Sequence, residues 1–423
     1  MRLLCMVLQY PPDINASGQL MAQLCRGLSE AGHRITVITS FPHYEQFRVL
    51  PAYRKRLYSR NREGGVDVIR LFAYARGDKS MKHRLINYLV FNLLALMTAV
   101  LLRAHWDALL CVNGSFFTGL TGWLIGKIKG SPFVYNVQDL YPDVPIRAGQ
   151  LRNPVAISIL KRLEVFMYRK AAHITVISAA MKANLLAKGV SPNILSIIPN
   201  FTDPRFIRVL PKRNDFSRRH GLCEKFVVMH AGNLGYVYDL HTLLGAASLL
   251  SNYPDIVVAI IGNGVMKAEL QQRAEALQLK NILFLPFQLY ETLPWLRASA
   301  DVHVSLYQSG AAGESFPSKI YEIMASGRPM ILGVEARSEL ERLVTETGSG
   351  LRVKPGDSAE LAEAILRLYR DPDLREQMGK SSRAYAEKNC SLHSAVAAYD
   401  ELFRKMDDSC STLPLAAPLQ NYR

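Results

Sequence analysis

The sequence predicts an α/β protein built from two doubly wound domains. Short apolar segments rich in Val, Ile and Leu alternate with helical patterns over most of the 423 residues. Each segment is continuously apolar, as expected for strands of a parallel sheet that is covered on both faces. A chain of this length also exceeds one ordinary core, so about two or three domains are expected.

The first series of patterns predicts a domain over residues 1–203. Helices are predicted near residues 20–32 and at 85–102, and strands at 3–8, 33–39, 66–72, 107–113, 133–140 and 173–178. The pattern breaks at 196–206, where two prolines and several polar residues interrupt it. The apolar start "MRLLCMVLQYPP" is short for a signal peptide and predicts a buried first strand.

The alternation restarts after this break and predicts a second domain over residues 204–390. Helical patterns separate its strands, which are predicted at 226–233, 255–264, 281–287, 301–306 and 329–333. A last helix is predicted at 391–406. From Asp407 the chain has Ser and Pro without periodicity, so residues 407–423 are expected to be a loose tail.

Composition limits the class of protein and its partners. The 49% hydrophobic and 21% charged content is typical of a globular chain. The six cysteines form neither a CxxC pair nor a compact cluster with histidine, so neither a disulfide framework nor a zinc site is expected, and a reducing, cytoplasmic setting is favoured. The net charge of +15 indicates an anionic partner, which nucleic acid, acidic lipid and nucleotide phosphates would all satisfy.

The stretch "AAGESFPSKIYEIMASGRPMILG", residues 311–333, carries the main candidate site. Pro317 is predicted to be the first helical residue, which would leave backbone N–H groups near Ser318 free to bind an anion, with Lys319 as a point charge for a diphosphate. The carboxylates of Glu314 and Glu322 could accept hydrogen bonds from vicinal hydroxyls, one for a ribose and one for a sugar ring. Solvated surface charges that favour a helix start remain an alternative for both.

This stretch resembles a known family. "ESFPSKIYE" matches the E-x7-E signature of retaining GT-B glycosyltransferases of family GT4, and the Pro-Ser-Lys form is similar to the WcaI/WbuB-like group of bacterial polysaccharide biosynthesis. The resemblance spans almost the full chain through "PPDINASGQLMAQLCRGLSEAGHRITVIT", "VQDLYPD" and "HAGNLGYVYDLHTLL". It implies two Rossmann-like domains that face a central cleft, the last helix returning to the first domain. It also implies transfer of a sugar from a nucleotide-diphosphate sugar to a glycan or lipid-linked acceptor.

The resemblance also implies roles for individual residues. Glu322 would bind the ribose, Glu314 the hydroxyls of the donor sugar, and Lys319 the diphosphate. Gly18, in the loop 11–18, would give the donor access to the backbone, although an ordinary turn glycine is the alternative reading. In the family the diphosphate departs ahead of attack on the same face and helps to deprotonate the acceptor, so no enzymic nucleophile is required.

Two further loops would hold the donor by the same resemblance. The segments "AGNLG" and "IIGNG" would approach the phosphates and "LPF" the base, which makes Gly232, Asn233, Gly235, Gly262, Gly264 and Phe287 candidate donor-binding residues. The chain departs from many family members, because Asn233 stands where they carry an arginine, and Tyr238 and Asp239 where a lysine is usual. The number of cations at the diphosphate is therefore open.

In the first domain, Asp139 of "QDLYPD" and residues 113–115 follow predicted strands and are candidates for the acceptor side. We count Asp139 with Glu314 and Lys319 as a candidate catalytic residue. An Asx-turn or a helix cap is the alternative reading. His173 precedes a strand and is expected to be structural.

The apolar helix at 85–102 has three readings: a transmembrane span, a buried domain helix, or an in-plane membrane contact. A span would separate two strands that must share one sheet, whereas the many basic residues in 48–103 favour acidic lipid. An enzyme at the inner face of the cytoplasmic membrane would suit a lipid-linked acceptor.

Other functions remain open at this stage. A nucleotide-sugar epimerase of similar architecture would keep the donor site, and a non-catalytic protein could bind anionic lipid or nucleic acid, although the sequence has no known nucleic-acid motif. A dehydrogenase would need G-x-G-x-x-G after the first strand, where "YPPDINASG" stands. Neither a metal nor a cofactor is expected besides the nucleotide-sugar substrate. The donor base and sugar, the acceptor and the oligomeric state are not predicted.

Overall fold

The computed structural model describes residues 1–13, 15–44, 47–77, 80–147, 149, 151–310 and 317–411. The chain divides into two compact units. The first comprises Met1–Val176, Leu185–Ile198 and the chain from His393 onward, and the second comprises Ile177–Asn184 and Pro199–Leu392. The change from the first to the second unit thus falls after Ile198, within the segment 196–206 where the sequence pattern breaks.

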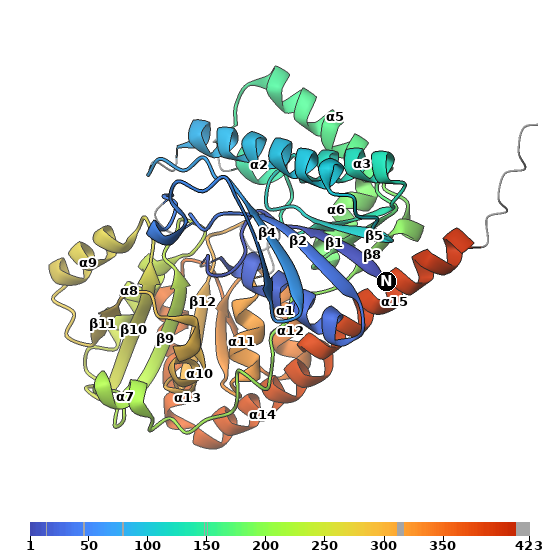
Figure 1. Ribbon diagram of the computed structural model, residues 1–423. Helices are drawn as coiled ribbons and strands as arrows, with labels where there is room; N and C mark the ends of the chain where they lie inside the picture. Colours follow the sequence, from blue (N-terminus) through green and yellow to red (C-terminus); the bar gives the residue numbers. More distant parts are fainter. Residues whose placement is uncertain are drawn as a thin grey trace, which may run out of the picture. The chain divides into compact units, whose positions relative to one another are not determined.

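The first unit is built on one mainly parallel sheet, which within the described residues has the strand order β3-β4-β2-β1-β5-β6-β7-β8 (Figure 1). Helices α2, α3 and α5 lie on one face of this sheet, and α1 and α15 on the other. The elements are β1 (Arg2–Met6), α1 (Ala16–Glu30), β2 (Arg34–Ser40), η1 (Pro51–Tyr53), β3 (Tyr58–Glu63), β4 (Val66–Leu71), α2 (Met81–Leu101), β5 (Ala108–Val112), α3 (Thr118–Lys129), β6 (Phe133–Val137), α4 (Asp143–Arg147), α5 (Pro154–Lys170), β7 (His173–Val176), η2 (Pro192–Ile194), β8 (Leu195–Ile197) and α15 (Leu392–Ser411). Helix α6 (Ala179–Ala187) includes the boundary after Asn184, so most of it belongs to the second unit.

Burial explains why the central strands were readable from the sequence. Strand β1 pairs with β2 on one side and β5 on the other, with Leu3 opposite both Ile35 and Ala108. All three side chains are buried, so the strands carry continuous apolar runs. Strand β3 was not predicted because "YSRNRE" is polar and mostly exposed, and it forms by antiparallel pairing with β4 at the sheet edge.

Helix α15 belongs to the first unit although it ends the described chain. The buried Tyr399 hydroxyl accepts a hydrogen bond from Asn136 Nδ2 at 2.9 Å and lies 3.1 Å from Thr175 Oγ1. The Asp400 carboxylate lies 2.8 Å from His33 Nε2. The helix continues to Ser411, so the prediction that the loose tail begins at Asp407 was wrong. The helix extends past the end of the apolar pattern because adding residues to an established helix costs little free energy. Residues 412–423 of that predicted tail lie outside the described part.

The second unit has a fully parallel sheet in the order β11-β10-β9-β12-β13-β14, as far as its residues are described. The elements are α7 (Asp215–Arg219), β9 (Phe226–Asn233), α8 (Leu240–Leu249), β10 (Ile256–Asn263), α9 (Lys267–Ala276), β11 (Ile282–Leu285), η3 (Tyr290–Thr292), α10 (Leu293–Ala298), β12 (Val302–Leu306), α11 (Lys319–Ala325), β13 (Met330–Gly333), α12 (Glu339–Thr347), β14 (Gly350–Val353), α13 (Ser358–Arg370) and α14 (Pro372–Asn389).

Alternate residues of β9 enter two different cores. Val228 packs with Leu243 of α8 and Ile365 of α13 on one face. Val227 packs with Leu296 of α10 on the other face. Successive side chains of a strand point to opposite faces, so one continuously apolar strand serves both layers of helices.

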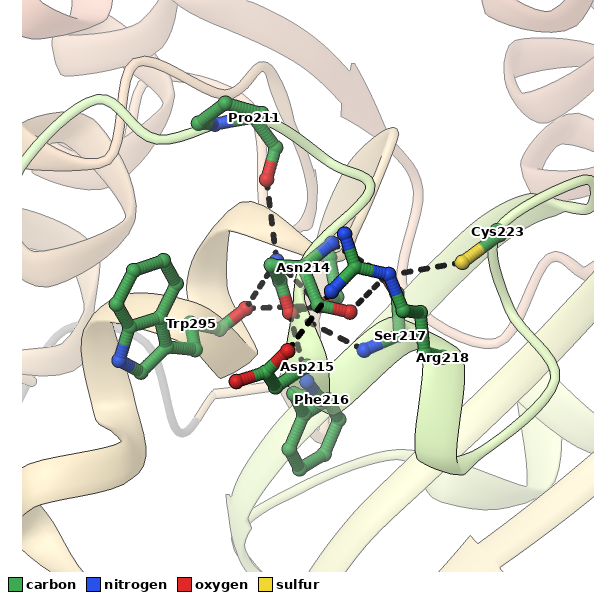
Figure 2. Close-up of polar contacts among 9 residues, drawn as sticks. Pro211, Asn214, Asp215, Phe216, Ser217, Arg218, Cys223 and Trp295 are labelled. Atoms are coloured by element: carbon green, nitrogen blue, oxygen red, sulfur yellow. Dashed lines mark hydrogen bonds and ion pairs between the residues drawn. The ribbon is translucent and has the colours of Figure 1, made fainter.

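A buried asparagine fixes helix α10 beside α7 (Figure 2). The Asn214 Oδ1 atom accepts from the backbone N–H groups of Phe216 and Ser217 and so caps α7. Its Nδ2 donates to the carbonyls of Pro211 and Trp295, each at 3.1 Å. Because Trp295 lies on α10, these bonds set the position of the helix that carries Arg297.

Candidate active site

The candidate site lies at the carboxyl edge of the second sheet. Strand β9 is flanked by β10 on one side and β12 on the other, so the order of strands reverses between β9 and β12. In open α/β sheets, ligands bind beyond the carboxyl ends of the strands at this reversal. The segments that leave the edge are the turn after β9, the turn after β10 and the connection from β12 to α11.

Helix α11 begins at Lys319 with Ser318 as its N-cap, so the predicted start at Pro317 was wrong. Two i→i+3 bonds close the turn before the helix: Ile320 N–H donates to the Pro317 carbonyl, and Tyr321 N–H to the Ser318 carbonyl. This tight turn delays the regular α-helix. Predicted residue Glu314 lies outside the described residues, as do its neighbours at 311–316.

The Lys319 ammonium is buried at the edge of the sheet without a hydrogen-bond acceptor among the described residues. It lies 3.7 Å from the centre of the Tyr238 ring, a cation–π contact. It also lies beside Gly232, where an added Cβ would be 3.9 Å from Nζ. Burial and the nearby Arg297 guanidinium lower the pKa of Lys319 well below its ordinary value, against the opposing effect of Glu322.

Glu322 is held by a buried arginine that the sequence analysis did not identify. Arg297 Nη2 donates to Glu322 Oε2 at 2.6 Å, and the exposed fractions of the two side chains are 4% and 24%. Arg297 Nε and Nη1 have no partner in the described chain. A signal was present, since Arg297 is the lone charged residue in "LPWLRASA", the segment before β12.

Two buried histidines near Lys319 and Arg297 stay neutral. Burial, together with the nearby Lys319 and Arg297 charges, lowers the pKa of both His230 and His303 well below the ordinary value. Among the described residues, Arg297 is paired with the carboxylate of Glu322, whereas the Lys319 ammonium has no hydrogen-bond acceptor. Such an arrangement favours an anionic ligand.

The two glycine turns lie directly against each other. Gly232 and Gly262 have φ of +149° and +147°. A Cβ added at Gly262 would lie 1.9 Å from the Gly232 carbonyl oxygen, and one at Gly264 would lie 2.3 Å from the Leu234 carbonyl oxygen. The glycines are therefore required for close packing of the strand ends of β9 and β10.

Gly262→Ala is expected to destabilise the second unit by about 2–3 kcal/mol, because both the clash and the backbone conformation oppose a side chain. Gly356→Ala is the matched control, since Gly356 has φ of +79° but nothing within 4 Å of an added Cβ. Chemical denaturation followed by circular dichroism measures both. Equal losses in the two variants would show that the contact with Gly232 is unimportant.

The remaining candidates of the second unit surround this centre. Asn233 ends β9, and its side chain covers Gly235, where an added Cβ would lie 3.1 Å from Asn233 Nδ2. Phe287 follows β11 and is half exposed.

Tyr238 and Asp239 stand where many family members carry a lysine. The Tyr238 ring makes the cation–π contact with Lys319, and the Asp239 carboxylate caps α8 by accepting from the Thr242 N–H. Arg297 thus supplies a second cation at a position that the family comparison did not suggest.

The first-unit candidates have different surroundings. Gly18 lies in helix α1, not in the predicted loop, because the Asn15 side chain accepts from the Gly18 N–H and starts the helix earlier. A Cβ at Gly18 would lie 2.7 Å from the Gln9 carbonyl oxygen.

The acceptor-side candidates Asn113 and Asp139 are bonded to each other. The Asn113 side chain exchanges hydrogen bonds with the backbone of Asp139, and burial raises the pKa of the Asp139 carboxyl. His173 Nε2 lies 2.8 Å from Ser196 Oγ.

No metal-binding group of three or more His, Cys, Asp or Glu side chains occurs among the residues described here. The five cysteines whose side chains are described, Cys5, Cys25, Cys111, Cys223 and Cys390, are free thiols.

Comparison with known proteins identifies the family of each half. Residues 16–200 match the glycosyl transferase 4-like domain, and residues 212–385 match the glycosyl transferases group 1. WcaI of Escherichia coli K12, assigned to colanic acid biosynthesis as a glycosyl transferase, is 28% identical over 408 residues, which cover 94% of this chain and 98% of WcaI.

Solved structures show the same fold. Anabaena HepE in complex with UDP and glucose superposes with a TM-score of 0.72 at 18% identity, covering 96% of this chain and 100% of HepE. Sucrose-phosphate synthase of Thermosynechococcus elongatus gives a TM-score of 0.76 at 18% identity, covering 96% and 99%. Both matched families are glycosyltransferases, so neither the epimerase, the dehydrogenase nor the non-catalytic binding protein is supported. The chain is a glycosyltransferase with the GT-B fold and belongs to the GT4-like family that the E-x7-E stretch indicated.

Proposed function

We propose that this glycosyltransferase transfers a sugar, with retention of configuration, from a nucleotide-diphosphate sugar to a glycan or lipid-linked acceptor in the biosynthesis of a cell-surface polysaccharide. The observation that carries the proposal is a pair of buried basic groups at the reversal point of the second sheet, the Lys319 ammonium and the Arg297 guanidinium. Within the described residues only Arg297 is paired with a carboxylate, that of Glu322. HepE, which has the same fold, was solved with UDP and glucose. WcaI, which is related along nearly the whole chain, is assigned to colanic acid biosynthesis.

The donor would be held by residues with separate tasks. The Lys319 ammonium would bind the diphosphate, for which its unpartnered Nζ and its place beside the Gly232 turn are suitable. Glu322 would accept from the ribose hydroxyls, with Arg297 holding its other side. Glu314 is assigned to the donor sugar by family resemblance alone.

In the proposed reaction the bond from the sugar C1 to the phosphate oxygen breaks, and a bond from C1 to the acceptor oxygen forms on the same face. The acceptor proton goes to an oxygen of the leaving diphosphate. The protein contributes chiefly electrostatic stabilisation of that diphosphate, worth roughly 3–4 kcal/mol for a well-placed donor. We assign the acceptor to the first domain near Asp139, and we propose that the reaction needs no metal and takes place on the cytoplasmic side of the membrane.

Calorimetric titration with UDP, GDP, ADP and dTDP tests the donor assignment. We expect one nucleotide to bind with a Kd in the micromolar range, equally well with and without EDTA, and Lys319→Met to weaken it by about tenfold or more, since a charge-assisted contact contributes about 1.5–3 kcal/mol. Lys380→Met, which changes a lysine whose side chain is 76% exposed on α14, is the control. The proposal is wrong if none of the four nucleotides binds, or if Lys319→Met binds the nucleotide as tightly as Lys380→Met.

A further inference from the structure

Helix α2 is long and apolar enough to span a membrane, but in the fold one of its faces is buried and the other is exposed. Residues Lys82–Leu101 have a mean hydropathy of 1.7, enough by length and composition to cross a membrane, and only 28% of the most apolar segment is buried. The buried and the exposed residues lie on different faces of the helix, which makes it possible to decide between the readings that the sequence left open.

The inner face of α2 is fixed to the first unit. Phe91, Ala95 and Ala99 are fully buried. Asn87 Nδ2 lies 2.9 Å from His43 Nε2, and Asn92 Nδ2 donates to Ser115 Oγ at 2.7 Å. The strands before and after the helix, β4 and β5, belong to the same sheet. A helix with both ends on one sheet and polar side chains bonded within the domain does not cross a bilayer.

The outer face of α2 carries a row of exposed apolar side chains. Leu85, Leu89, Leu93 and Met97 follow one another at intervals of four residues, and Leu101 continues the row; we call these five residues the apolar stripe. Their exposed fractions lie between 45% and 76%. Residues four apart share a helix face, so the side chains form one continuous surface. Contiguous exposed apolar surface marks an interaction site more often than scattered single residues do.

Basic residues border the apolar stripe at both ends. Lys82 precedes it and Arg103 follows it, both exposed. On the neighbouring helix α3, Lys127 is exposed, and the Lys129 ammonium donates to the carbonyls of Val100 and Leu102 at the end of α2. The sequence from Ser80 to Trp106 contains neither aspartate nor glutamate. The stripe is therefore an apolar surface in a positively charged border.

We propose that the apolar stripe docks α2 in the plane of a bilayer that contains anionic phospholipid. The leucines and Met97 would enter the boundary between headgroups and acyl chains by roughly 5–10 Å, and the flanking lysines and arginines would contact the phosphates. The charge pattern selects this occupant, because a second copy of the chain would bring an equally positive border against the stripe. The proposal does not depend on the nucleotide-sugar reaction.

Flotation of the full chain with vesicles tests the apolar part. Vesicles of phosphatidylglycerol and phosphatidylcholine are compared with vesicles of phosphatidylcholine alone. The triple variant Leu89→Gln, Leu93→Gln, Met97→Gln is expected to lower vesicle affinity at least about tenfold, since each methylene that enters the bilayer contributes to the free energy of binding. The control is Leu249→Gln with Leu277→Gln, two exposed leucines of the second unit that should leave binding unchanged.

The charged border is tested with Lys82→Gln and Arg103→Gln together, which keep the stripe intact. We expect weaker binding to the anionic vesicles and a smaller dependence on salt concentration. Thermal denaturation and nucleotide titration show whether each variant is folded, and unaltered nucleotide binding separates this proposal from the proposed reaction. Equal binding to both kinds of vesicle, full binding by the triple variant, or a dimer that the triple variant dissociates would each overturn it.

Discussion

Lys319→Met is expected to slow sugar transfer strongly and to make the protein more stable. The wild-type ammonium is buried, carries a lowered pKa and has no acceptor in the described chain, so the folded state holds a charge that water would solvate better. Methionine keeps most of the volume and removes the charge. We expect a gain of about 1–2 kcal/mol in the free energy of unfolding and a loss of about 10²–10³-fold in kcat.

The stability difference should depend on pH with a definite sign. Because the folded-state pKa of Lys319 lies below the ordinary value of 10.5, the unfolded chain binds more protons between the two values. Wild-type stability contributed by this group therefore rises with pH across that interval, and the advantage of Lys319→Met shrinks. Urea unfolding at several pH values measures the effect, with Lys380→Met as the control. A less stable Lys319→Met would mean that the ammonium has a partner that stabilises it.

Glu322→Gln is expected to lower stability by about 2–3 kcal/mol, because it leaves the buried Arg297 without its carboxylate. Arg297→Met on its own should lower the free energy of unfolding by less, since the Glu322 carboxylate that it leaves unpaired is partly exposed and can be hydrated. In the double variant, Glu322→Gln with Arg297→Met, most of the free energy of unfolding that Glu322→Gln loses should return. Its nucleotide affinity should stay low because the ribose contact is lost. Unfolding and calorimetry of the four proteins complete the double-mutant cycle.

The pair Glu376 and Lys380 on α14 provides the reference cycle. Its side chains are 67% and 76% exposed, and solvent screens such i,i+4 pairs so that they contribute little to stability. A coupling energy for Arg297 and Glu322 no larger than that of this reference pair would show that Arg297 does not position Glu322. Recovery of nucleotide binding in the double variant would instead remove Glu322 from the donor site.

Burial on both faces made the central strands predictable. Strand β9 was predicted at residues 226–233 and occupies Phe226–Asn233, because its first six residues are all buried and the apolar run has clear ends. The polar edge strand β3 lacks that signal and forms through its pairing with β4. Helix α11 starts later than the position of Pro317 suggested, because the i→i+3 bonds of the preceding turn are not visible in composition.

The candidate site was only partly predictable for a related reason. Lys319 and Glu322 lie within one short motif, so the sequence places them together. Arg297 lies on another helix, and its approach to Glu322 depends on how Asn214 holds α10 against α7. Likewise, the sequence showed that α2 is apolar, but only the buried Asn87 and Asn92 show which face turns inward.

The return of α15 to the first unit affects the order in which the protein can be completed during synthesis. Tyr399 and Phe403 are buried in the first unit, yet they are made after the whole of the second unit. On the ribosome the second unit can therefore assemble as soon as its last helix emerges, whereas the first, although translated earlier, keeps an uncovered surface beside α1 and β6. The nascent first domain must stay soluble with this surface open until the final helix is released.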